Sequence, residues 1–167
     1  MDGKVWWDNQ WWDVPAGYDW QQSTHSDYPY SLGWFMATTD TTTEFYKVDT
    51  KQWVHRPISI TLTFTSPVGT TSQTVTVDKG TAIGNKLPGS PVSATGYRFN
   101  KWMLNGTQIT SSYIVNSAQT ITADLSVLVT AKYQDGSDNW VTQTMWVDYG
   151  STLQQVFDAY ASAAGNI

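Results

Sequence analysis

Cysteine is absent from this chain of 167 residues, which excludes disulfides and thiolate metal sites. Glutamate is almost absent as well, because thirteen of the fourteen acidic residues are Asp and only Glu44 is Glu. Asp favours turns and helix caps, whereas Glu, Lys and Ala favour helix interiors. The scarcity of Glu, Lys and Ala, together with abundant Thr and Val, predicts a mostly β protein of the α+β class.

Charge is scarce too, since 14% of the residues are charged against a usual ~25%. The nine basic residues are scattered along a chain of net charge −5. Phosphate binding needs clustered Lys and Arg, so nucleic acids and anionic membrane surfaces are disfavoured as partners. No apolar run approaches the ~20 residues of a membrane span, and the opening MDGKVWWDNQWW lacks the features of a signal peptide. We therefore expect no membrane insertion and no signal peptide.

Tryptophan, by contrast, is concentrated in residues 1–57, which contain seven of the ten Trp residues. Two near-repeats, at 5–8 and 10–13, each carry a Trp pair. Because neighbours on a strand face opposite sides, either both faces of this segment are buried or one Trp of each pair meets a partner. Short strands are predicted at 33–37, 44–48 and 52–54.

From residue 58 the pattern becomes a strict alternation of apolar and polar residues. It predicts a half-buried strand over 58–65, followed by a turn at 67–69 and a partner strand over 73–78. Asn105-Gly106 between apolar runs predicts a hairpin with a type I′ turn, since both residues tolerate positive φ.

The C-terminal part of the chain is predicted to contain strands over 127–133 and 140–148 and then a helix over 153–161. Ser151 and Gln154 fit a capping box at the start of that helix.

An internal repeat links these elements, because residues 72–87 align with residues 142–157 at an offset of 70. A period of this length indicates tandem modules. The expected regions are a Trp-rich anchoring or interaction region (1–57), a small β module (58–134) and a partial second copy made of a strand and a helix (135–167).

Several motifs of the module occur in a recognisable order: Val77-Asp78-Lys79-Gly80, Pro88 and Pro91, Gly96-Tyr97-Arg98-Phe99-Asn100-Lys101-Trp102, Asn105-Gly106, and Thr130-Ala131-Lys132-Tyr133. Through them residues 58–133 resemble the internalin-type B-repeat, also called the Listeria–Bacteroides repeat. Lys101 stands where the family has Gly, and Lys79 where it has an aromatic residue; the second copy has Tyr149 there. Residues 140–160 match in part, and residues 1–57 do not.

The resemblance implies small β-grasp-like modules, each a sheet packed on a short helix. Such modules serve as spacers and binding modules in adhesins, secreted proteins and phage virion proteins, and they bring no catalytic residues. The module core is expected at Tyr97, Phe99, Trp102 and Tyr133, whose large side chains meet near the predicted hairpin.

The two histidines, His25 and His55, have no Asp, Glu or Cys at ligand spacing, so surface or turn roles are expected for both. The sequence shows no nucleophile-elbow signature either. We expect no enzyme activity, no metal and no cofactor.

The candidate interaction residues are aromatic side chains of the N-terminal region: Trp6, Trp7, Trp11, Trp12, Trp20, Tyr28, Tyr30 and Trp34. Each Trp buries roughly 150–250 Å², so a core or interface role is favoured over full exposure. Trp and Tyr are also enriched at interface hot spots. The alternative is a sugar-binding groove in which rings stack on the sugar and carboxylates accept its hydroxyls, the carboxylates being Asp8, Asp13, Asp19 and Asp27.

Together these features predict a non-enzymatic, externally exposed structural or adhesion protein. Its concrete form would be a bacteriophage virion accessory protein (capsid decoration or fibre-like) anchored by residues 1–57. The alternatives are a fragment of a bacterial cell-surface adhesin and a carbohydrate-binding module. The expected partners are other protein subunits in an oligomer or larger assembly, with surface glycans as second candidates. The expected location is the virion surface or the extracellular space.

Overall fold

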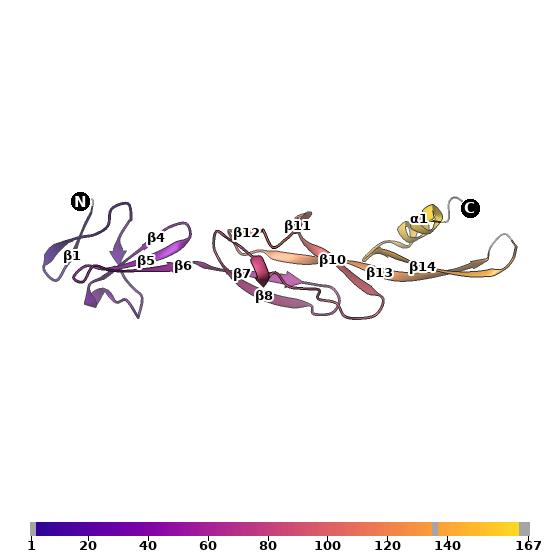
Figure 1. Cartoon of the computed structure of the whole chain (residues 1–167), viewed down its shortest axis with the longest axis horizontal. Coiled ribbons are helices and arrows are strands. Elements are labelled where there is room, and N and C mark those ends of the chain that lie inside the picture. The colour runs from indigo at the N-terminus through magenta and orange to yellow at the C-terminus, as the bar shows by residue number, and fades with distance from the viewer. Residues whose placement is uncertain (1–2, 135–136, 164–167) are drawn as a thin grey trace. The chain divides into compact units, whose positions relative to one another are not determined.

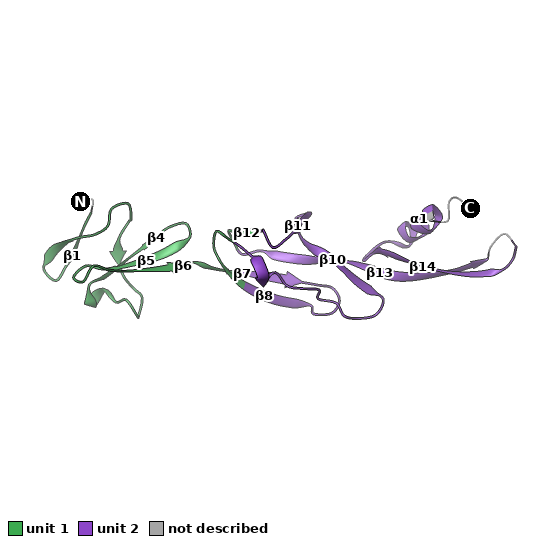
Figure 2. Ribbon diagram, in the orientation of Figure 1, with its two compact units in different colours: residues 1–60, 76–81, 114–117 green, residues 61–75, 82–113, 118–167 purple. Residues whose placement is uncertain are grey.

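The computed structural model describes residues 3–134 and 137–163. Within these ranges the chain is mostly β and has one α-helix, α1 (Leu153–Ala163), near its C-terminal end (Figure 1). The predicted class is therefore confirmed. The chain forms two compact units: unit 1 contains residues 1–60, 76–81 and 114–117, and unit 2 contains the rest (Figure 2). In the part of the chain that is described, no helix has the length and apolar character to cross a membrane.

Unit 1 contains a hairpin and a four-stranded antiparallel sheet. The hairpin pairs β1 (Lys4–Trp7) with β2 (Gln10–Asp13). The sheet has the order β3-β4-β5-β6, with bounds β3 (Gln21–Gln22), β4 (Trp34–Thr38), β5 (Thr42–Lys47) and β6 (Gln52–Pro57). The third predicted strand is longer than expected, because Pro57 still pairs with Thr42. Unit 1 continues through residue 60.

Aromatic side chains cover both faces of this sheet. On one face Phe35, Tyr46 and Val48 form a core cluster with Val5 of the hairpin. On the other face Phe45 is buried, and the ring of Tyr28 lies 4.5 Å from it. Neighbouring residues of β5 are thus buried on opposite sides, which explains why Phe45 and Tyr46 are both apolar although they are adjacent.

The only glutamate, Glu44, lies in this core with 4% of its surface exposed. Its carboxylate accepts hydrogen bonds from Trp53 Nε1 at 2.9 Å and from Thr42 Oγ1 at 2.8 Å, and it pairs with His55. A buried carboxylate is tolerated only with partners of this kind, so Glu44 is a structural residue of unit 1.

The predicted β module is a mixed sheet of order β11-β10-β13-β7-β8, with bounds β7 (Ser59–Thr65), β8 (Ser72–Asp78), β10 (Tyr97–Leu104), β11 (Thr107–Ile109) and β13 (Thr120–Gln134). β13 pairs with β7 in parallel and with β10 antiparallel. A two-stranded ladder joins β9 (Thr81–Ala82) to β12 (Ile114–Val115). The β10–β11 turn has φ of 48° at Asn105 and 80° at Gly106, as a type I′ turn requires.

Trp102 is the centre of this module's core, with 2% of its surface exposed. Its ring lies 4.9 Å from that of Phe64 and 5.1 Å from that of Phe99, and its Nε1 donates to the Pro88 carbonyl at 2.8 Å. Tyr97 is half-buried beside Tyr149. The fourth expected core residue, Tyr133, lies outside this core. β13 continues beyond Val127, the partner of the first residue of β10, and Tyr133 is in that continuation.

The B-repeat resemblance implies a short helix between β8 and β10. The structure has the three-residue 3-10 turn η2 (Gly84–Lys86) there instead. Gly84 has a φ of 58°, and Pro88 and Pro91 follow, so a longer α-helix cannot form here. A similar turn, η1 (Tyr30–Leu32), precedes β4 in unit 1.

Beyond β10, the second part of β13 pairs with β14 (Trp140–Asp148) in an antiparallel ribbon, and α1 follows (Figure 1). The helix is capped one position later than expected. Thr152 N–H donates to Gln155 Oε1 at 2.7 Å, and Gln155 N–H donates to Thr152 Oγ1 at 3.3 Å. Ser151 does not cap the helix because its hydroxyl donates to the Asp148 carbonyl instead. This ribbon and helix belong to unit 2 together with most of the module.

Candidate interaction site

The β1–β2 hairpin, here called the Trp hairpin (Lys4–Asp13), is built by a two-residue turn. Asp8 and Asn9 have φ of 49° and 57°, the positive values of a type I′ turn. This turn places Trp6 opposite Trp11 and Val5 opposite Trp12. Each Trp pair of the sequence is therefore divided between the two faces of the hairpin.

The inner face of the Trp hairpin packs on the four-stranded sheet of unit 1. Val5 is buried, and Trp7 and Trp12 pack against the same core cluster. Trp12 Nε1 donates to the Trp7 carbonyl at 2.9 Å. The Trp7 ring covers Gly33, where a Cβ would lie 3.3 Å from the ring and φ is +87°. This close contact holds the hairpin on the sheet.

The outer face of the hairpin carries the exposed pair of the site. Trp6 and Trp11 are 47% and 53% exposed, and their rings are 5.3 Å apart in an edge-to-face arrangement. The Tyr30 hydroxyl donates to the Trp6 carbonyl at 3.2 Å and ties the strand to unit 1. Two large apolar rings are thus exposed on a hairpin whose backbone is held in place by contacts of its inner face. Exposed, rigidly held Trp side chains are typical of interface anchors.

Most of the carboxylates considered for sugar binding already have partners within the chain. Lys4 Nζ donates to Asp13 Oδ1 at 2.5 Å, and this hydrogen bond, with the charge of Lys4, lowers the pKa of the Asp13 carboxyl below its usual value. Asp19 accepts a hydrogen bond from Gln21 at 2.9 Å, and Asp27 lies 3.7 Å from Arg56. Three of the four carboxylates considered for sugar binding are therefore engaged by neighbours.

The remaining candidate aromatics are inside unit 1. Trp20 and Tyr30 pack against the core cluster, and Trp20 Nε1 donates to the Pro15 carbonyl at 2.8 Å. Trp34 is 6% exposed, and Tyr28 is half-buried between Trp34 and Phe45. The structure brings Trp6 and Trp11 together on the surface and places Trp7, Trp12, Trp20, Tyr28, Tyr30 and Trp34 in or against the core.

A second apolar surface was missed by reasoning from the sequence. It lies on α1, where Leu153 is 70% exposed and Phe157 57%. The sequence signal for it is the 3-4 spacing of apolar residues in the predicted helix, which includes both Leu153 and Phe157.

The histidines have structural contacts. His25 accepts a hydrogen bond from the Asp27 backbone N–H at 3.1 Å, and His55 stacks on Trp53 with ring centroids 5.1 Å apart. Among the described residues, no group of three His, Asp or Glu side chains could hold a metal ion.

Comparisons of the chain with family models, with curated proteins and with solved structures find no match. The interpretation of the Trp hairpin therefore depends on its own geometry.

Proposed function

We propose that this chain is a non-enzymatic structural or adhesion protein that binds another protein subunit through Trp6 and Trp11. Its concrete form is a bacteriophage virion accessory protein attached by its N-terminal region. The B-repeat resemblance supports the virion or adhesin setting, and the exposed Trp pair supports the binding role.

The exposed Trp pair carries the proposal. Trp is among the residues most enriched at hot spots, where a few rigid side chains supply most of the binding energy. The backbones of both strands are held by the inner-face contacts of Trp7 and Trp12. The surface is therefore preorganised, and the hairpin loses little conformational entropy when a partner binds.

Ring geometry favours a protein partner over a sugar. The Trp6 and Trp11 planes are inclined by 70°, so they do not form one flat platform. The nearby Asp13 carboxylate is bonded to Lys4. Sugar hydroxyls would have to displace that ammonium group before they could use the carboxylate.

Site-specific photo-crosslinking tests the proposal in the virions or cells that carry the protein. A photoreactive phenylalanine derivative is placed at position 6 or 11, with Thr50, exposed in the β5–β6 turn, as the control position. We expect a cross-link to a structural subunit from positions 6 and 11 and none from position 50. Double substitution of Trp6→Ser and Trp11→Ser should weaken binding of that subunit at least about tenfold.

Gln10→Ser is the matched control, because Gln10 lies between the two Trp pairs and is exposed. It should leave the binding unchanged. A glycan-array signal that disappears in the Trp double variant, without any protein cross-link, would contradict the proposal and identify a carbohydrate-binding module.

A further inference from the structure

The turn after β14 has the same structure as the turn after β8. Gly80 and Gly150 have φ of 81° and 85°. The Thr81 hydroxyl donates to the Asp78 carbonyl at 2.7 Å, and the Ser151 hydroxyl donates to the Asp148 carbonyl at the same distance. The sequence repeat is therefore also a repeat of backbone and hydrogen bonds.

The strand before each turn can be aligned in the same way. Lys79 N–H donates to the Ile58 carbonyl at 2.7 Å, and Tyr149 N–H donates to the Leu125 carbonyl at 2.8 Å. Leu125 thus takes the position of Ile58, and by this register Val129 takes that of Leu62 and Ala131 that of Phe64. We call residues 58–127 the complete repeat, and the described residues within 128–163 the half repeat.

In the complete repeat, a parallel strand covers the edge of β7 that faces away from β8. Thr63 pairs with Thr120 and Thr65 with Thr122, and Thr63 N–H donates to the Gln119 carbonyl at 2.9 Å. By the same register, Thr130 and Lys132 are the equivalents of Thr63 and Thr65 in the half repeat.

The equivalent edge of β13 is open. The Leu125 carbonyl points to β14, and backbone direction alternates along a strand, so the polar groups of Thr130, Lys132 and Gln134 point the other way. β10 occupies that edge only as far as Leu128, whose N–H donates to the Gly96 carbonyl at 2.8 Å. In residues 3–134 and 137–163, no strand pairs with this edge beyond that point.

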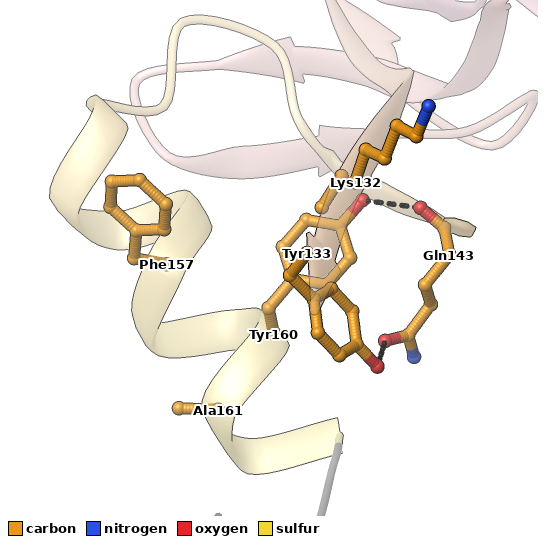
Figure 3. Close-up of a pocket in the computed structure, with 7 residues that line it drawn as sticks. Lys132, Tyr133, Gln143, Phe157, Tyr160 and Ala161 are labelled. Carbon is orange, nitrogen blue, oxygen red and sulfur yellow. Dashed lines mark hydrogen bonds between the residues drawn. The ribbon is translucent and has the colours of Figure 1, made fainter. Parts of the chain in front are cut away.

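The apolar face beside the open edge is only partly covered, by α1. Phe64 is 0% exposed and contacts Trp102, whereas its equivalent Ala131 lines a hollow of about 270 Å³ next to α1. Figure 3 shows Tyr133, Phe157 and Tyr160 around this hollow, with the Tyr160 hydroxyl against the Gln143 carbonyl at 3.0 Å. The half repeat therefore has the backbone of the complete repeat but lacks what fills its core.

We propose that this open edge binds a strand donated by a partner polypeptide, which adds parallel to residues 129–134 of β13 and completes the second repeat. An unprotected sheet edge templates strand addition, in which backbone hydrogen bonds give affinity and alternate side chains give specificity. The site is continuous with an interface already in the fold, because the donated strand would follow β10 along the same edge of β13.

The chemistry of the occupant follows from the complete repeat. The strand that covers β7 carries the buried residues Ile121, Ala123 and Leu125 at every second position. The donated strand should have the same alternation, together with an aromatic side chain that enters the hollow at Ala131. That the donor is another subunit rests on the proposed function; the open edge itself does not.

Amide hydrogen exchange on the full chain tests the proposal, with a polypeptide of residues 94–128 of this sequence as the donor probe. A saturating concentration of probe should slow exchange at the amides of Thr130 and Lys132 at least about tenfold. Exchange at Thr144 and Trp146, whose amides point to the outer edge of β14, should not change. This readout needs no substitution.

Two proline variants provide a matched pair, because Thr130 and Thr144 lie directly opposite each other and both are exposed. Thr130→Pro removes an N–H from the open edge and should weaken probe binding at least about tenfold. Thr144→Pro removes an N–H from the outer edge and should leave binding unchanged. The Trp6→Ser and Trp11→Ser double variant should bind the probe as well as the wild type does. Loss of the proposed function at the Trp pair can therefore be distinguished from loss of strand binding at the open edge.

Three results would overturn the proposal. One is unchanged exchange at Thr130 and Lys132 with saturating probe. Another is equal loss of binding in both proline variants. The third is a dimer of the chain, seen by light scattering without probe and dissociated by Thr130→Pro, which would make a second copy the occupant.

Discussion

The complete repeat and the half repeat have the same local structure and different burial. Both have a strand pair, a positive-φ glycine and a hydroxyl that closes the turn at 2.7 Å. Ile83 of the complete repeat is 2% exposed, whereas its equivalent Leu153 is 70% exposed. The repeated segment of about sixteen residues (72–87 and 142–157) thus forms the same strand and turn in both places. Burial of its apolar side chains needs a second segment that packs over them.

The two repeats also differ in the segment that follows the turn. After Gly80 the chain makes only η2 before Pro88, whereas after Gly150 it makes α1 (Leu153–Ala163). α1 packs Val156 and Tyr160 toward the ribbon and leaves Leu153 and Phe157 exposed. Apolar area that remains in water contributes no hydrophobic stabilisation, so the half repeat should tolerate substitutions that the complete repeat does not.

The largest expected difference is at the aromatic residues. Trp102→Ala should destabilise the complete repeat by about 3–5 kcal/mol, because it leaves a cavity against Phe64 and removes the bond to Pro88. Phe157→Ala should cost less than about 0.5 kcal/mol, since its side chain is 57% exposed. Hydrogen exchange of β7 and β10 amides measures the first and that of β14 amides the second. Comparable costs at both sites would show that the half repeat is covered in solution.

Equivalent aliphatic positions give a smaller effect of the same kind. Ile83→Ala should cost about 2–4 kcal/mol, because Ile83 is 2% exposed in the core of the complete repeat. Leu153→Ala should be within about 0.5 kcal/mol of neutral, since alanine also favours a helix. Urea unfolding followed by backbone amide NMR signals separates the two repeats. A destabilised α1 in Leu153→Ala would contradict the comparison.

Much of the fold could be predicted because its signals are local. Alternation from Ile58 predicts β7, and Asn105-Gly106 predicts the β10–β11 turn through its positive φ. The division of the Trp pairs was also accessible in principle. A two-residue turn at Asp8-Asn9 makes residues 6 and 11 opposite neighbours, and the sequence leaves open only which face meets the core.

Features that depend on distant contacts could not be predicted. The sequence predicts Tyr133 in the last strand and the core of the module. β13 extends beyond its pairing with β10, however, and Tyr133 lies beside α1. Ser151 and Gln154 fit a capping box as well as Thr152 and Gln155 do, and the choice depends on the bond from Ser151 to Asp148. The open edge of β13 depends on where β10 begins, which no local pattern specifies.

The glycines of the two turns should behave alike. Gly80→Ala and Gly150→Ala each place a Cβ at φ above 80°, which costs about 1–2 kcal/mol. At Gly80 the Cβ also meets the Thr41 methyl at 2.9 Å, a side chain that can rotate away. Local opening free energies from amide exchange in β8 and β14 measure both costs. A cost at Gly150 well below that at Gly80 would show that the half repeat does not hold its turn.

The smallest expected effects are at the two turn hydroxyls. Thr81→Val and Ser151→Ala each remove one exposed hydrogen bond, to the carbonyls of Asp78 and Asp148, at a cost of about 0.5 kcal/mol. Exchange of the amides of Thr81 and Ser151 and of their neighbours provides the measurement. The Ser151 bond has a further consequence, because Ser151 in the wild type competes with Thr152 for the helix cap. In Ser151→Ala the Thr152–Gln155 capping box should persist and α1 should begin at the same residue, because alanine cannot cap a helix. A shifted start of the helix would contradict this expectation.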